Sequence, residues 1–214
     1  MNKPYKIAVI DYQLSNMFSI KNALSILGFE VEVTSDYSTI LSCDGAILPG
    51  VGSFPEAINN IKELNLDDAI KDFIASGKTF VGICLGFQLL FDKSDEIEDT
   101  FGLGILPGEV KSFSALNDRI RVPHVGWNNV KKKQMLNINN NLNPLKKFND
   151  EEYFYFIHSC YVKPMDNNDI YTSTQYGGID FCSSILKENI FACQFHPEKS
   201  GKKGIRILSE IFNR

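Results

Sequence analysis

Three residues in two short segments could together form a nucleophilic catalytic site. The segment 81-VGICLGFQLL-90 places Cys84 between two glycines, directly after an apolar run. The segment 191-FACQFHPEKS-200 places His196 and Glu198 on either side of one proline. A cysteine nucleophile needs a base that takes and returns a proton, and the base needs a carboxylate that holds its tautomer. The residue types therefore predict a catalytic triad of Cys84, His196 and Glu198.

Cys84 belongs to a G-x-C-x-G pattern between a predicted strand and a predicted helix. Such a turn presents one side chain to a cleft, and its glycines relieve the crowding around that side chain. The helix dipole favours a thiolate there, and the backbone N–H of Leu85 is available to a developing oxyanion. Two less specific interpretations stay open: Cys84 as a buried core residue, and His196 as a surface histidine near a turn.

The turn 49-PGVGSF-54 is a second candidate part of the site, because it follows another predicted parallel strand. Its glycines allow close backbone approach, so the amide of Val51 or Gly52 could complete an oxyanion hole with Leu85. The segment lacks the G-K-[ST] ending of a P-loop, which disfavours phosphate binding. An ordinary strand–helix turn is the alternative interpretation.

The two other histidines are competing candidates for the base. His124 lies in PHVGW and His158 in IHSCY, and neither has a carboxylate within a few residues in sequence. A base without a carboxylate lacks the group that would stabilise its imidazolium. We therefore expect His124 and His158 to be structural or to line the substrate site.

The predicted elements place these segments in an α/β protein. Strands and helices alternate over about the first hundred residues, which indicates a parallel sheet with right-handed crossovers. Ligands bind at the carboxyl ends of such strands, where Cys84 and the 49–54 turn both lie. Later segments predict added antiparallel structure. The expected strands are 6–10, 29–33, 44–50, 79–83, 105–113, 120–130, 153–162, 170–175 and 181–195, and the last of these is expected to fold as a hairpin. Five helices are expected: one that ends at Gly28, one over 54–64, one over 67–76, one that begins near Leu85, and one over about 201–213.

Composition and charge exclude several classes of function. The chain has 214 residues, of which 43% are hydrophobic, and a net charge of -4, so no overall basic field attracts nucleic acid. The first apolar run is too short for a signal segment or a membrane span, which predicts a cytoplasmic protein without membrane contact. The five cysteines form no CxxC pair and the three histidines lack metal-ligand spacing, so we expect no disulfide framework, no metal and no cofactor.

The motifs PGVGSF, GICLGFQLL and QFHPEKS together resemble those of the class I glutamine amidotransferases, which use a Cys–His–Glu triad. The segments AVIDY, FGLGILPGEV, VPHVGWNNV, YFIHSCYV and HPEKSGKKG resemble the glutaminase subunits of imidazole glycerol phosphate synthase within that family. The resemblance implies a single glutamine amidotransferase domain over residues 1–214. Its fold would be α/β, with a mostly parallel central sheet flanked by helices and added antiparallel strands in the C-terminal half.

The resemblance also implies a reaction and a role for each site residue. Cys84 would attack the side-chain amide of glutamine, form a γ-glutamyl thioester and release ammonia, after which water frees glutamate. His196 would act as general base and then acid, and Glu198 would orient it. A carboxylate suits the substrate ammonium, and backbone donors suit the substrate carboxylate. The glutamine would be held by Gln88, Glu96 and the backbone of Ser159, Cys160 and Tyr161.

The resemblance implies a separate synthase partner, because the glutaminase domain accounts for the whole chain. The partner would be a cyclase with a (β/α)₈ barrel that forms a heterodimer with this chain. It would use the ammonia to make imidazole glycerol phosphate and AICAR in histidine biosynthesis. Lys199 and the aromatic cluster 153–156 match positions near that interface in relatives. An apolar core strand is the alternative interpretation of the cluster.

Three positions depart from the family pattern. The segment 13-QLSN-16 replaces a glycine-rich one, Phe87 stands where methionine is common, and Cys193 stands where glycine is common. The first departure is expected near the partner interface, so the ammonia acceptor stays open. The alternatives are a subunit that supplies ammonia for amidino-sugar synthesis on surface glycans, a stand-alone γ-glutamyl hydrolase, and a scaffold subunit with a broken triad.

Overall fold

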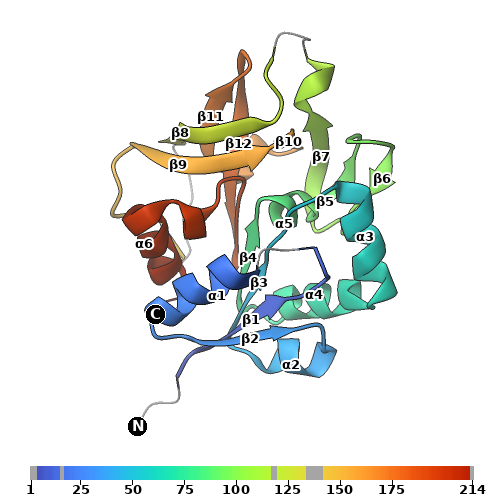
Figure 1. Cartoon of the computed structure of the whole chain (residues 1–214), viewed down its shortest axis with the longest axis vertical. Helices are drawn as coiled ribbons and strands as arrows, with labels where there is room; N and C mark the ends of the chain where they lie inside the picture. The colour runs from blue at the N-terminus through green and yellow to red at the C-terminus, as the bar shows by residue number, and fades with distance from the viewer. Residues whose placement is uncertain (1–3, 15–16, 117–119, 134–141, 213–214) are drawn as a thin grey trace.

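The first strand of the protein, β1 (Lys6–Ile10), is apolar along most of its length, which is typical of a strand covered by helices on both faces. The computed structural model, which describes residues 4–14, 17–116, 120–133 and 142–212, has this three-layer arrangement (Figure 1). Ile7 and Val9 pack in one hydrophobic core, whereas Ala8 and Ile10 pack in the other. Successive side chains of a strand point to opposite faces, so the strand joins both cores.

One mixed sheet organises the described part of the chain. Its further strands are β2 (Glu30–Thr34), β3 (Gly45–Leu48), β4 (Thr79–Ile83), β5 (Phe91–Ser94), β6 (Thr100–Phe101), β7 (Leu106–Ser112), β8 (His124–Lys132), β9 (Glu151–His158), β10 (Cys160–Pro164), β11 (Ile170–Tyr176), β12 (Ile179–Lys187) and β13 (Ile190–Cys193). Within the described residues the main strand order is β2-β1-β3-β4-β13-β12-β10-β7-β5-β6, and β11, β8 and β9 continue from β12.

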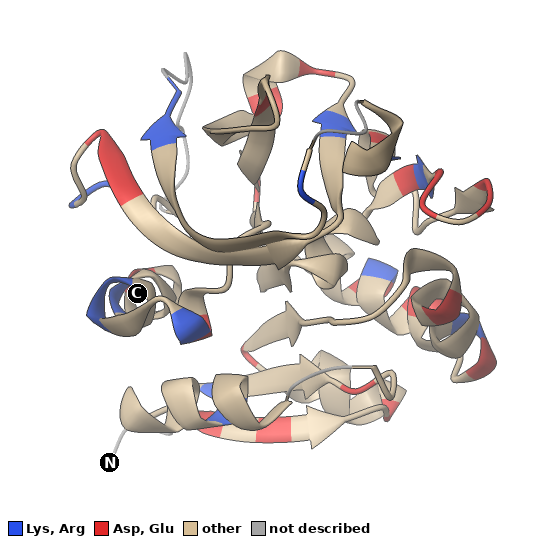
Figure 2. Cartoon of the chain, turned by 45° about the horizontal axis from the view of Figure 1, so that its top comes forward, with Lys and Arg blue, Asp and Glu red and all other residues tan. Residues whose placement is uncertain are grey.

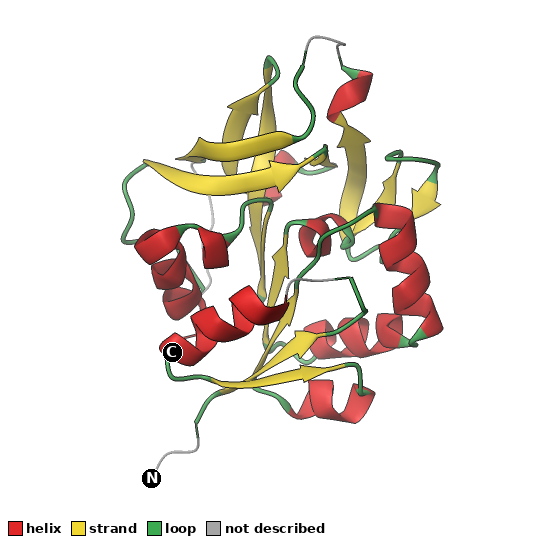
Figure 3. Ribbon diagram, viewed as in Figure 1, coloured by secondary structure: helices red, strands yellow, loops and turns green. Residues whose placement is uncertain are grey.

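The helices cover the two faces of the parallel part of the sheet (Figures 1 and 3). Residues of α1 and α6 pack in one core, and residues of α2, α3 and α4 pack in the other. The helices are α1 (Met17–Ile26), α2 (Tyr37–Ser42), α3 (Phe54–Glu63), α4 (Leu66–Ala75), α5 (Leu85–Gln88) and α6 (Gly201–Phe212), with 3₁₀ turns η1 (Phe113–Ala115), η2 (Asn167–Asp169) and η3 (Pro197–Lys199). None of the helices in the described ranges is long and apolar enough to cross a membrane.

The predicted change from parallel to antiparallel strands is confirmed, with two exceptions, the parallel pairs β5–β7 and β13–β4. Strands β1, β2, β3 and β4 pair in parallel, whereas β12 pairs antiparallel with β10, β11 and β13. Strand β13 nevertheless pairs in parallel with β4, in the register Cys193↔Ile83. Parallel neighbours end at the same edge of a sheet, so the segment after β13 lies beside the segment after β4.

The structure corrects one predicted strand. The segment 153–162 is two strands, β9 and β10, because Ser159 interrupts the extended chain. Strand β9 pairs with β8 while β10 pairs with β7, so the interruption lets the chain change partners within the sheet. The sequence pattern also did not predict α2, β5 and β6. Positions 15 and 16 of the departing 13–16 segment lie outside the described residues.

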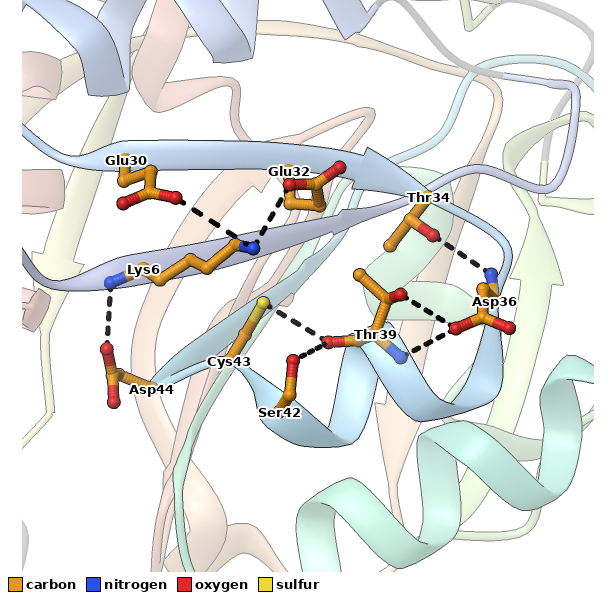
Figure 4. Close-up of polar contacts among 9 residues, drawn as sticks. All are labelled: Lys6, Glu30, Glu32, Thr34, Asp36, Thr39, Ser42, Cys43 and Asp44. Carbon is orange, nitrogen blue, oxygen red and sulfur yellow. Dashed lines mark hydrogen bonds and ion pairs between the residues drawn. The ribbon is translucent and has the colours of Figure 1, made fainter.

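Polar contacts fix the edge of the sheet that is formed by β2 (Figure 4). Asp36 is the N-cap of α2 and accepts a hydrogen bond from the Thr39 backbone N–H at 2.8 Å. Hydrogen bonds from the Ser38 and Thr39 side chains lower the pKa of the Asp36 carboxyl group to about 2. Lys6 on β1 lies 3.1 Å from the Glu32 carboxylate on β2, so the ion pair joins the two parallel strands.

Candidate active site

Cys84 occupies a strained turn between a strand and a helix. Strand β4 ends at Ile83, helix α5 begins at Leu85, and Cys84 between them has φ 55 and ψ -108. A residue other than glycine held at positive φ costs about 1–3 kcal/mol, which the surrounding packing must offset. A Cβ at Gly86 would overlap the Leu48 carbonyl oxygen, so only glycine lets the turn pack this closely on β3. The turn has the geometry that the G-x-C-x-G pattern predicts.

His196 and Glu198 form a buried pair just beyond β13. His196 Nδ1 lies 2.8 Å from Glu198 Oε1, and the two side chains are 4% and 2% exposed. A carboxylate only accepts hydrogen bonds, so Nδ1 carries the proton in this contact. The other ring nitrogen, Nε2, is buried without a hydrogen-bond partner in the described chain. The pair therefore leaves one imidazole nitrogen free to exchange a proton.

The charges around His196 favour its imidazolium form. Burial by itself would lower the pKa of His196, but the negative charge on Cys84 and the carboxylate of Glu198 outweigh burial and raise the pKa to about 10. The Cys84 backbone N–H donates to the Cys193 carbonyl oxygen at 2.8 Å, which joins the two segments that carry the sulfur and the base. The structure thus brings Cys84, His196 and Glu198 together.

A cavity of about 290 Å³ opens beside Cys84. It is lined by most of the residues that the sequence predicted for the site, together with Pro123, Ile157 and His158. Tyr161, His196 and Glu198 are not among the lining residues, and the Tyr161 ring packs against Phe113 with centroids 4.8 Å apart. The predicted residues that line the cavity are Val51, Gly52, Cys84, Leu85, Gln88, Glu96, Ser159, Cys160 and Lys199.

Two polar side chains in the cavity wall, Glu96 and Gln88, also form hydrogen bonds with the protein backbone. Glu96 accepts a hydrogen bond from the Phe54 backbone N–H, the first residue of α3, at 2.6 Å. Gln88 donates from Nε2 to the Cys160 carbonyl oxygen at 3.1 Å. The hydrogen bond from Phe54 ties the Glu96 side chain to the start of α3 and fixes its position beside the cavity.

The sequence names the amide of Val51 or Gly52, both in the glycine-rich turn, as a second oxyanion donor beside Leu85. The Val51 backbone N–H donates to the Leu14 carbonyl oxygen at 3.1 Å and is therefore engaged within the protein. Tyr12 donates from its hydroxyl to the Pro49 carbonyl oxygen at 2.7 Å and holds the start of the turn. The Leu85 N–H, at the first position of α5, has no acceptor within its own helix. In this conformation Leu85 is better placed than Val51, and Gly52, which lines the cavity, stays a predicted donor.

His124 and His158 form a hydrogen-bonded pair on β8 and β9. His158 Nδ1 lies 2.6 Å from the Cys160 carbonyl oxygen, and His158 Nε2 lies 2.9 Å from His124 Nδ1. The carbonyl only accepts, so His158 donates from Nδ1 and accepts at Nε2 from His124. Burial lowers the pKa of His158 to about 3 and that of His124 to about 4. His158 lines the cavity, and His124 stacks on Tyr176 with centroids 3.9 Å apart, so the expectation for both histidines fits the structure.

Sequence reasoning named the motif QFHPEKS but assigned no role to its polar residues Gln194 and Ser200. Gln194 is fully buried, and its Nε2 lies 3.6 Å from Cys84 Sγ. Ser200 is 2% exposed and donates to the His196 carbonyl oxygen at 2.7 Å. The signal that could have identified Gln194 is an uncharged polar residue within an otherwise apolar segment next to the predicted base.

The fold and the site belong to a known class of enzymes. The family described as glutamine amidotransferase class-I matches residues 8–213, and the chain belongs to this family. The imidazole glycerol phosphate synthase subunit HisH of Aquifex aeolicus is 44% identical over 210 residues, which cover 98% of this chain and 96% of that protein. The protein of the same name from Rhodopirellula baltica is 42% identical over 208 residues, which cover 96% of both.

Solved structures show the same fold at lower sequence identity. The structure of PurLQS from Thermotoga maritima has a TM-score of 0.74 and 21% identity and covers 99% of both chains. A second structure, described as a glutamine amidotransferase, has a TM-score of 0.71 and 15% identity and covers 96% of both chains. The predicted architecture, a mostly parallel sheet with helices on both faces and added antiparallel strands, is confirmed.

Proposed function

We propose that this chain is the glutaminase subunit of an imidazole glycerol phosphate synthase. The observation that carries the proposal is the strained turn that presents Cys84 beside the buried His196–Glu198 pair, in a chain whose relatives bear the name of that subunit. The chain would act as one glutamine amidotransferase domain over residues 1–214. It would convert glutamine and water into glutamate and ammonia.

The reaction proceeds through a thioester on Cys84. The sulfur attacks the carboxamide carbon of glutamine, and the leaving nitrogen takes a proton from His196 Nε2 and departs as ammonia. His196 then takes a proton from water, which attacks the thioester and releases glutamate and the Cys84 sulfur. Glu198, 2.8 Å from His196 Nδ1, holds the ring and stabilises its positive charge. The Leu85 N–H is the first donor to the oxyanion, at roughly 3 kcal/mol per donor.

The cavity wall supplies contacts for a zwitterionic amino acid. Glu96 is the carboxylate for the substrate ammonium, and the backbone around Ser159 and Cys160 faces the substrate carboxylate. Gln88 keeps this backbone in place through its hydrogen bond to the Cys160 carbonyl oxygen. Tyr161 contributes through its backbone alone, because its ring packs on Phe113 outside the cavity.

The ammonia goes to a cyclase partner with a (β/α)₈ barrel, which forms a heterodimer with this chain. Strands β8 and β9 have no Lys, Arg, Asp or Glu over 124–130 and 153–158, and Figure 2 shows the middle of both strands without charge colours. Trp127 and Tyr153 on these strands are 56% and 55% exposed. Apolar surface of this kind marks an interaction site. Lys199 lines the cavity and is exposed, so it supplies a cation at the same edge.

The residues of the aromatic cluster 153–156 fit two different roles, partner interface and core strand. Phe154 and Phe156 are fully buried, as a core strand requires. Tyr153 is exposed and Tyr155 is partly exposed, so these alternate residues of β9 face outward. We assign the outward pair to the partner interface and the inward pair to the core.

The experiment that tests the proposal uses the complex with the cyclase partner. We expect Cys84→Ala to abolish synthesis that depends on glutamine and to leave synthesis from added ammonia unchanged, because the substitution removes only the nucleophile. Product formation is measured with each nitrogen source in turn. Loss of both activities would show that Cys84 is also needed for synthesis from ammonia, which contradicts a role in glutamine cleavage alone. A partner that makes an amidino sugar, or rapid hydrolysis by the isolated chain, would support the alternatives instead.

A further inference from the structure

Gln194 is a buried polar residue at the point where the segment after β13 lies beside the segment after β4. It directly follows β13, its exposed fraction is zero, and its backbone N–H donates to the Ser183 carbonyl oxygen at 2.9 Å. The preceding residue, Cys193, accepts from the Cys84 backbone N–H at 2.8 Å. The parallel pairing of β13 with β4 therefore places Gln194 alongside Cys84.

The hydrogen bonds around Gln194 determine which end of its amide faces the sulfur. Gln88 Nε2 has two hydrogens and donates to the Cys160 carbonyl oxygen at 3.1 Å and to Gln194 Oε1 at 3.0 Å. A backbone carbonyl only accepts, so the Gln88 atom that faces it is the nitrogen. The Gln194 atom that faces this nitrogen is then the oxygen. The Gln194 amide nitrogen is left to face Cys84 Sγ at 3.6 Å.

We propose that Gln194 is the hydrogen-bond donor that stabilises the negative charge on Cys84, oriented for this role by Gln88. The proposal rests on the proposed function, because it concerns the nucleophile of that reaction. A neutral thiol at Cys84 donates to the Ile157 carbonyl oxygen, which lies 3.7 Å from Sγ. When the thiol proton moves to His196 Nε2, the S–H bond breaks, an N–H bond forms, and the sulfur keeps the electron pair.

The anionic sulfur accepts a hydrogen bond and can no longer donate one. Gln194 Nε2 supplies the donor, and a hydrogen bond to a charged acceptor in a buried site is stronger than one in water. The site thus offers a different partner to each protonation state of Cys84, the Ile157 carbonyl for the thiol and the Gln194 amide for the anion. This assigns Gln88 a second role beside substrate binding, because it orients the amide that faces the nucleophile.

The experiment measures how fast iodoacetamide alkylates Cys84 in the full chain between pH 5 and pH 10, with the modified residue identified by peptide mass spectrometry. Gln194→Met keeps the length of the side chain but removes the donor. We expect the pH midpoint of Cys84 alkylation to rise by about one unit, because a hydrogen bond to a charged group is lost. The titratable and charged groups that face Cys84 or its cavity stay in place in this variant: His196, Glu198, Lys199, Tyr12, Cys193, His158, Cys160 and Glu96.

A second variant and a control keep the result interpretable. Gln194→Glu keeps the side-chain volume and an oxygen for Gln88, but it places an acceptor against the sulfur, so its midpoint should rise at least as far. Thr172→Val is the matched control, because Thr172 is fully buried and bonded to the hydroxyl groups of Ser183 and Ser184 at 2.9 Å and 2.6 Å. Its midpoint should equal that of the wild type.

The outcome that overturns the proposal is an unchanged midpoint in either Gln194 variant that folds, as judged by thermal unfolding. A loosened core would change the alkylation rate at every pH in the same proportion and leave the midpoint in place. Failure of the wild-type complex to cleave glutamine would overturn the proposed function instead. The alkylation profile does not depend on that reaction, so the two failures are distinguishable.

Discussion

The protein buries its three histidines in two regions, one of which favours the positively charged imidazole and the other the neutral imidazole. In the His196 region, a carboxylate and the Cys84 sulfur raise the pKa of His196 to about 10, although burial opposes this. In the histidine pair, burial lowers the pKa of His158 to about 3 and that of His124 to about 4, and the charges of His124 and His196 also lower the pKa of His158. All three rings are nearly inaccessible to solvent, so exposure does not explain the difference.

The difference shows that negative partners, and not burial, decide where this protein keeps a positive charge. Burial favours the neutral form of any histidine, and an adjacent anion can reverse that preference. His196 has two such groups, Glu198 at 2.8 Å and the Cys84 sulfur. Among the residues that the structure describes, the hydrogen-bond partners of the histidine pair are uncharged and include the Cys160 carbonyl oxygen and the Asn128 amide at 3.1 Å.

The largest effect is expected when the carboxylate is removed from the His196 region. Glu198→Gln keeps the shape of the side chain but removes the charge, so the His196 ring loses both its fixed tautomer and its support as an imidazolium. We expect kcat for glutamine hydrolysis in the complex to fall about ten-thousandfold, by comparison with triads in which the carboxylate is replaced by an amide. Synthesis from added ammonia should be unchanged.

Glu152→Gln is the matched control for this prediction. Glu152 is 8% exposed and pairs with Lys203, in a part of β9 that is not in the cavity wall. The substitution therefore removes a largely buried carboxylate without touching His196. Equal losses of kcat in the two variants would show that general destabilisation, and not the charge on Glu198, lowers the rate.

The sequence predicted the His196 region more completely than the histidine pair, and the reason is physical. Cys84, His196 and Glu198 have side chains whose chemistry is unusual enough to be identified from type and spacing alone. The fold prediction succeeded for the same kind of reason, since apolar runs such as β1 and β4 coincide with strands in the structure. Both results follow from patterns that are local in sequence.

What the sequence could not predict depends on contacts between distant segments. His124 and His158 are 34 residues apart, and only the pairing of β8 with β9 places them opposite each other. Val51 was one of two amides expected to face the ligand, but Leu14, from a segment that departs from the family pattern, accepts its hydrogen bond. The break at Ser159 was also missed, because the residues on both sides of it have strand patterns.

A smaller effect is expected when pH is used to charge the histidine pair. The folded-state pKa of His124, about 4, lies below the ordinary value of 6.5, so the unfolded chain binds a proton first as the pH falls. Stability is therefore present above pH 6.5 and is lost on acidification toward pH 4. The expected slope for one such group is at most about 1.4 kcal/mol per pH unit. His196 has the opposite sign, with stability present below pH 6.5 and lost as the pH rises through about 10.

The measurement is urea unfolding of the wild type and of His124→Gln at several pH values from 7 to 4. Glutamine cannot be protonated in this range but can still donate toward His158. We expect a lower stability at pH 7, since stacking on Tyr176 is lost, and a shallower dependence on pH below 6.5. Parallel curves for the two proteins would show that His124 is not kept neutral by the fold.

The smallest expected effect comes from a hydroxyl group that positions His196 without changing any charge. Ser200 Oγ donates to the His196 carbonyl oxygen at 2.7 Å and accepts from the Tyr155 backbone N–H at 3.0 Å. Tyr155 in turn accepts from the His196 backbone N–H at 2.9 Å, so the three residues form a closed set of hydrogen bonds that fixes the base. Ser200→Ala should lower kcat by about tenfold through misplacement of the ring, with little change in KM.

Ser200→Thr separates position from charge in this last case, because it keeps the hydroxyl and adds only a methyl group. We expect it to restore most of the lost rate and most of the roughly 1–3 kcal/mol of stability that an unpaired buried group costs. The pH profile of kcat should be the same in the wild type and in both variants, since the charges on Glu198 and Cys84 are untouched. A shifted pH profile of kcat in Ser200→Ala would mean that the backbone position of His196 also controls its charge. Anionic partners and burial would then not be enough to explain the charge states of the histidines.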